Sequence, residues 1–66
     1  MKVGDYVASS NWVYEVADID FKYIKLIRLG DRASTNWSRA VLEERISDGM
    51  YNVVLPTFVG WIPVND

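Results

Sequence analysis

The side chains that could do acid–base chemistry in this 66-residue chain are carboxylates, because the sequence contains no histidine and no cysteine. Glu15, Asp18 and Asp20 lie close together in sequence, and Glu43 and Glu44 are adjacent. General acid–base catalysis needs such groups held within hydrogen-bond reach of one substrate. Asp18 and Asp20 share the parity of one strand, where we expect them to be surface charges, and the two glutamates diverge on a helix. The sequence therefore predicts that the protein is not an enzyme.

Metal and cofactor sites are not expected either. The Asp-x-Asp spacing of Asp18 and Asp20 starts like a calcium loop, but the glycine and later glutamate of such a loop are missing. Without histidine or cysteine a structural zinc site is not expected, and no phosphate-binding loop is present. We predict no cofactor and no metal.

Aromatic residues are dense, with three tryptophans and four tyrosines. Aromatic side chains dominate both cores and binding interfaces, so their number alone does not separate the two roles. Tyr14 and Tyr51 fall on the inward parity of their strands and are expected in the core. Trp12 and Trp37 adjoin polar residues, and for each of them surface binding and partial burial stay open. The role of Trp61 depends on where the C-terminal segment lies.

Charge is distributed unevenly along the chain, although the net charge is only −2. Basic residues crowd the third predicted strand and its exit loop, namely Lys22, Lys25, Arg28 and Arg32. With Trp37 and Arg39 nearby, they would form a surface for phosphate contact and base stacking on a single strand of nucleic acid. The acidic residues of the preceding strand are expected to face them across an antiparallel pair, which is ordinary sheet stabilisation.

Alternating apolar residues bounded by turn signals predict strands at residues 3–7, 13–20, 23–29 and 50–55. Ile19 falls on the wrong parity to face the core with the rest of its strand. A bulge at Ala17 and Asp18 would correct this, and a bend is expected at Gly4 and Asp5.

The stretch after the third strand has two interpretations. In one, a helix begins at Trp37 with Asn36 as its cap. In the other, residues 34–37 form a short strand, and Ser38 caps a helix that Gly49 ends in a left-handed conformation. We favour the second interpretation, because it places Trp37 on a strand and produces the order strand, short helix, strand.

A core for one domain of this length is marginal, although half of the residues are hydrophobic. Leu42 and Ile46, four residues apart, would contribute to it from one face of the helix. Pro56 is expected to end the last strand, because proline cannot donate to a ladder. Residues 56–66 are too apolar for a solvated linker, so they either add an edge strand that closes the sheet or contact a partner.

The segments Val-Gly-Asp-Tyr-Val at 3–7, Val-Tyr-Glu-Val-Ala-Asp-Ile-Asp at 13–20 and Tyr-Ile-Lys-Leu at 23–26 resemble the first three strands of Src-homology-3-like small barrels, including the KOW and Tudor types. The helix at 38–46 and the strand at 50–54 resemble the ending of many tiny barrels encoded by bacterial viruses and mobile elements. The resemblance implies a mainly β fold over residues 1–55, a small, strongly bent five-stranded barrel with one short helix before its last strand. Residues 56–66 would be an apolar C-terminal extension packed on the barrel or on a partner.

Two departures from the family pattern limit what the resemblance implies. The predicted helix is longer than the single turn of signalling-type barrels, and the chain has no recognisable aromatic groove for proline-rich ligands. We therefore do not expect recognition of that kind of peptide. Small barrels act by presenting a surface, and the resemblance implies a phage accessory protein that docks on a host protein or enzyme and inhibits or modulates it sterically.

The expected function is therefore that of a non-catalytic protein-binding module. The predicted partner-binding residues form two patches, Trp12, Asp31, Arg32, Trp37 and Arg39 in the first, and Phe58 and Trp61 in the second. One alternative is a nucleic-acid-binding barrel that uses Lys22, Lys25, Arg28 and Arg32. A second alternative is a structural subunit that assembles only with itself. The N-terminus has no apolar run behind its single basic residue, so we expect a cytoplasmic protein, in the host cytoplasm if viral, with no membrane partner.

Overall fold

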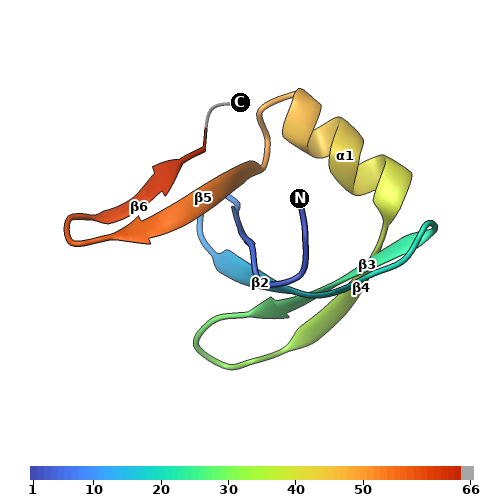
Figure 1. The fold of residues 1–66 in the computed structure, drawn as a ribbon, viewed down its shortest axis with the longest axis horizontal. Helices are drawn as coiled ribbons and strands as arrows, with labels where there is room; N and C mark the ends of the chain where they lie inside the picture. Colours follow the sequence, from blue (N-terminus) through green and yellow to red (C-terminus); the bar gives the residue numbers. More distant parts are fainter. Residues whose placement is uncertain (65–66) are drawn as a thin grey trace.

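Six antiparallel strands form one continuous sheet in the computed structural model, which describes residues 1–64 (Figure 1). The strands run in the order β4-β3-β2-β1-β5-β6 across the sheet. The elements along the chain are β1 (Tyr6–Ala8), β2 (Val13–Ile19), β3 (Tyr23–Arg28), β4 (Ser34–Ser38), α1 (Arg39–Ser47), β5 (Asn52–Thr57) and β6 (Gly60–Pro63). The prediction of a mainly β fold with one short helix before β5 is confirmed.

The sheet is open, which differs from the predicted closed barrel of five strands. β4 and β6 are its two edges, and they do not pair with each other. α1 connects β4 to β5, and its nine residues span about 13 Å at 1.5 Å per residue, which separates the two strands (Figure 1). β6 is a sixth strand that pairs with β5. Residues 56–64 of the predicted C-terminal extension therefore lengthen the sheet and do not close it. Its last two residues, 65–66, lie outside the described residues.

The predicted bulge in β2 is confirmed. The register between β2 and β3 shifts between Val16 and Asp18, so Ala17 has no direct partner. After the shift Ile19 pairs with Ile24, and it packs against the core as the bulge was expected to allow. The bend at Gly4 is also present, with a φ of 95°, and its N–H donates to the Val16 carbonyl at 3.0 Å.

The second interpretation of the 34–49 stretch is confirmed, since β4 precedes α1 and Ser38 is the N-cap residue. Ser38 caps differently from the prediction, because within the described chain its side chain accepts no hydrogen bond from the helix. The junction is held instead by the Arg39 N–H, which donates to the Lys22 carbonyl at 2.8 Å. Gly49 has a φ of 83° and its N–H donates to the Ile46 carbonyl, as expected for a left-handed helix stop.

The core lies between the sheet and α1. The fully buried side chains of this core come from β1, β2, β3 and the helix, namely Val7, Val16, Ile24, Leu26 and Leu42. Tyr14 and Tyr51 pack against this core, as predicted from their parity, and so does Ile46 one helical turn after Leu42. α1 therefore covers one face of the sheet through a single apolar stripe.

Pro56 does not end the last predicted strand, which is a correction to the sequence analysis. β5 continues to Thr57, and Pro56 lies opposite Trp61 of β6. The Val64 N–H donates to the Val53 carbonyl at 2.8 Å, so these two residues form a hydrogen-bonded pair. Hydrogen-bonded and non-hydrogen-bonded pairs alternate along an antiparallel ladder, so Pro56 and Trp61 form a non-hydrogen-bonded pair and the Pro56 nitrogen points away from β6. The nitrogen points towards the side of β5 that pairs with β1, but this pairing extends only as far as Val54. The absence of an N–H group at Pro56 therefore costs the sheet no hydrogen bond.

We expect Leu42→Ala to lower the free energy of unfolding by about 2–5 kcal/mol, because it leaves a cavity where α1 meets the sheet. Urea denaturation followed by far-UV circular dichroism measures the change. Val41→Ala, on the same helix but 39% exposed, is the matched control and should change stability little. Equal destabilisation by the two substitutions would contradict the assigned role of Leu42.

Candidate functional site

A second apolar cluster lies on the face of the sheet opposite the core. Tyr6 pairs with Val54 across β1 and β5, and its neighbour Val7 belongs to the core, so Tyr6 and Val54 point the other way. The Trp61 ring lies 4.9 Å from the Tyr6 ring, and Val54 is only 4% exposed. The cluster attaches β6 to the sheet. Trp61, which was predicted to bind a partner, therefore contributes to packing, and 40% of its surface remains exposed.

The β5–β6 hairpin carries a group of exposed apolar side chains, which we call the hairpin surface: Leu55, Phe58, Val59, Trp61 and Ile62. Phe58 and Val59 form the two-residue turn between the strands, and they are 110% and 92% exposed. The positive φ of this turn, 122°, belongs to Gly60, so the backbone at Phe58 and Val59 accommodates most residue types and requires no particular one. Two large apolar residues at this tip are therefore not explained by turn geometry or by the core.

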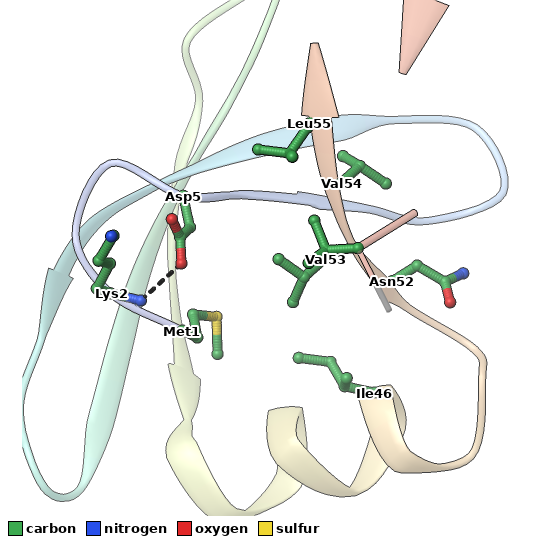
Figure 2. Close-up of a pocket in the computed structure, with 9 residues that line it drawn as sticks. Met1, Lys2, Asp5, Ile46, Asn52, Val53, Val54 and Leu55 are labelled. Atoms are coloured by element: carbon green, nitrogen blue, oxygen red, sulfur yellow. Dashed lines mark hydrogen bonds between the residues drawn. The ribbon is translucent and has the colours of Figure 1, made fainter. Parts of the chain in front are cut away.

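A cleft of about 650 Å³ adjoins the hairpin surface (Figure 2). It lies between the N-terminal segment, α1 and β5, and it is lined by Met1, Lys2, Asp5, Ile46, Asn52, Val53, Val54, Leu55 and Val64. Its polar end is ordered by the Lys2 backbone N–H, which donates to the Asp5 carboxylate at 2.9 Å. Leu55 belongs both to this cleft and to the hairpin surface, so the two adjoin along β5. Leu55 lies opposite Ile62, and Trp61 leaves the other face of the hairpin.

The first predicted patch does not form one surface, because its residues lie at the two ends of the β3–β4 pair. At one end the Arg28 guanidinium lies 4.3 Å above the Trp12 ring. Arg28 Nε also donates to Asp31 Oδ1 at 3.0 Å, and a second hydrogen bond joins Arg28 Nη2 to Asp31 Oδ2. Arg32 lies in the same loop with a φ of 60°. Trp12, Asp31 and Arg32 are thus grouped around Arg28.

Trp37 and Arg39 lie at the other end of β4, where both contribute to the fold. The Trp37 ring is half-buried against the core and lies 5.4 Å from the Tyr51 ring in an edge-to-face arrangement. Arg39 Nη1 donates to the Asp20 carbonyl at 3.3 Å, and its Nε lies 3.6 Å from the Glu43 carboxylate. These contacts join the β2–β3 turn, β4 and α1, so they are sufficient to explain both residues structurally.

The basic residues of the nucleic-acid alternative are divided between the two faces of the sheet. Lys25 and Arg28 are three residues apart on β3, so their side chains leave opposite faces. Lys25 pairs in register with Asp18, and Arg28 is neutralised by Asp31. Lys22 lies in the β2–β3 turn with its ammonium 5.7 Å from the Phe21 ring. The four cations therefore do not line one groove for a phosphate backbone.

Comparisons with protein families, with characterised proteins and with solved structures found no match. Among residues 1–64, no three carboxylate side chains come together as a metal-binding group. No helix in this part of the chain has the length and apolar character needed to cross a membrane.

Three members of the hairpin surface, Leu55, Val59 and Ile62, were not among the predicted binding residues. Leu55 alternates with Tyr51 and Val53, which indicated an inward position, but it lies beyond the end of β1 and is 51% exposed. A usable signal was the two-residue spacing between apolar strand segments, with Gly60 directly after Phe58 and Val59. The apparent stop at Pro56 concealed that hairpin.

The Arg28 guanidinium, together with the Ala33 N–H, lowers the pKa of the Asp31 carboxyl from its ordinary 3.8 to about 2. A lowered folded-state pKa stabilises the native state above the ordinary value, and this contribution is lost as pH falls through about 2. We expect Arg28→Gln to move the Asp31 titration midpoint up towards 3.8, as followed by carboxyl ¹³C NMR. Lys25→Gln should leave the midpoint in place, and an unchanged midpoint in Arg28→Gln would contradict the assignment.

Proposed function

We propose that this protein is a non-catalytic binding module that contacts a partner protein through the hairpin surface and the adjoining cleft. The observation that carries the proposal is the full exposure of Phe58 and Val59 at the hairpin tip. Large contiguous apolar patches are uncommon on monomers and mark interaction sites. Full burial of one large apolar side chain contributes about 1.5–3 kcal/mol, so Phe58 and Val59 can supply several kcal/mol towards the cost of association.

The state of two carboxylates, Asp20 and Asp31, supports a role without catalysis. The Asp20 carboxylate accepts the backbone N–H groups of Lys22 and Tyr23 at 2.8 and 2.6 Å, and these hydrogen bonds lower its pKa. Asp31 is held ionised by Arg28. A general acid or base at neutral pH needs its pKa moved in the other direction, towards 7. Both carboxylates have structural partners that account for them.

We further propose that the first five strands are a Src-homology-3-like small barrel left open on one side. The strand order β4-β3-β2-β1-β5, with β5 returning beside β1 after a helix, supports this relation. On the same resemblance, the partner would be a host protein or enzyme that the hairpin obstructs sterically, as expected of an accessory protein from a bacterial virus. The β5–β6 hairpin would then be this chain's own addition to the barrel.

We expect Phe58→Ser to weaken partner binding by at least about 30-fold, because central buried aromatics are the residues that dominate interfaces. The matched control is Phe21→Ser, which removes an 80% exposed phenylalanine from a different turn. Affinity capture with the two variants and the parent protein, followed by mass spectrometry, identifies proteins that only Phe58→Ser fails to retain. Titration of the identified partner then measures the affinity.

Equal retention of the partner by Phe58→Ser and by the parent protein would contradict the proposal. Retention of nucleic acid that falls steeply with salt and is lost in Lys25→Glu would contradict it as well, and would favour the nucleic-acid alternative.

A further inference from the structure

The outer edge of β4 presents main-chain groups that no residue of 1–64 uses in the sheet. The Arg28 N–H donates to the Ala33 carbonyl, and the Arg39 N–H donates to the Lys22 carbonyl, both at 2.8 Å. These bonds set the alternation of the β3–β4 ladder, in which Thr35 and Trp37 face β3. Ser34, Asn36 and Ser38 therefore direct their N–H and C=O groups outward, and all three side chains are exposed.

The two edges of the sheet differ in how they are protected. On β6 the pairing of Val64 with Val53 turns the Pro63 nitrogen to the outside, where it offers no donor. Proline on an edge is a common means of preventing strand addition. β4 contains no proline and no charged residue over Ser34–Ser38. It therefore has neither of these common protections, and a further strand can pair along its whole length.

β4 is complementary to itself when it is turned about a two-fold axis through Asn36. In that antiparallel register Ser34 lies opposite Ser38 of the second copy, and Asn36 lies opposite its own copy. All three outward residues then exchange both main-chain hydrogen bonds. No like charges face each other, and the Asn36 amide, which both donates and accepts, meets an identical amide. The small polar side chains give a foreign strand little to anchor on, whereas they suit this pairing.

We propose that two copies of this chain associate through antiparallel pairing of their β4 strands, which joins the two sheets into one. β6 lies at the opposite end of the strand order from β4. The pairing therefore leaves both hairpin surfaces free at the far ends of the joined sheet. This inference does not depend on the proposed function, and it predicts a symmetric dimer whose two hairpin surfaces lie apart.

Sedimentation of the full chain over a concentration series tests the pairing. As concentration increases, the measured mass of the parent protein should rise from the monomer value of 7.6 kDa towards twice that value. Asn36→Pro removes the two central hydrogen bonds and should weaken association roughly 30-fold, since each such bond contributes a factor of roughly 5. Asn36→Ala keeps the N–H and should still associate. Circular dichroism checks that each variant is folded.

Hydrogen exchange of the unaltered protein gives a second readout that needs no substitution. In the dimer the amides of Ser34, Asn36 and Ser38 should exchange more slowly as concentration rises, while Thr35 and Trp37 are protected at all concentrations. A monomer mass throughout the series would overturn the proposal. So would association that Asn36→Pro leaves unchanged and Phe58→Ser abolishes, or β4 amides that become protected only when another protein is added.

Discussion

The contact between α1 and the inner face of the sheet is the constraint on which the rest of the structure depends. Leu42 is fully buried there, and it completes a core whose other fully buried members come only from β1, β2 and β3. A chain of this length without cysteine has few other means of holding a fold. The same helix connects β4 to β5, so its packing against the core also helps to position these two strands.

Because the core is small, most of the side chains that could bind a partner also have a structural role. Trp37 packs against Tyr51, Arg39 joins the β2–β3 turn to α1, and Arg28 lies between Trp12 and Asp31. The hairpin surface is different, since Phe58 and Val59 make no comparable contribution to packing. Apolar side chains that are exposed and contribute little to packing indicate a candidate interface, whereas buried apolar side chains belong to the core.

The ends of the sheet are distinct chemical environments, although both are edges. β6 combines an outward proline with large apolar side chains, so it favours side-chain contacts over strand addition. β4 combines small polar side chains with free main-chain groups, so it favours strand addition. The two ends of this open sheet therefore present surfaces of different kinds.

The sequence by itself determined several local elements: β2 and β3, the bulge between Val16 and Asp18, the short strand before α1 and the Gly49 stop. These follow from side-chain alternation and turn chemistry over a few residues, which neighbouring strands do not alter. The first strand was predicted at 3–7 and lies at Tyr6–Ala8, because Gly4 forms a turn. Only the tertiary structure decided that Pro56 is tolerated, that Trp12 lies beside Arg28 and away from Trp37, and that the sheet stays open. Each of these depends on which strand, if any, lies beside a given residue, and that is a property of chain segments far apart in sequence.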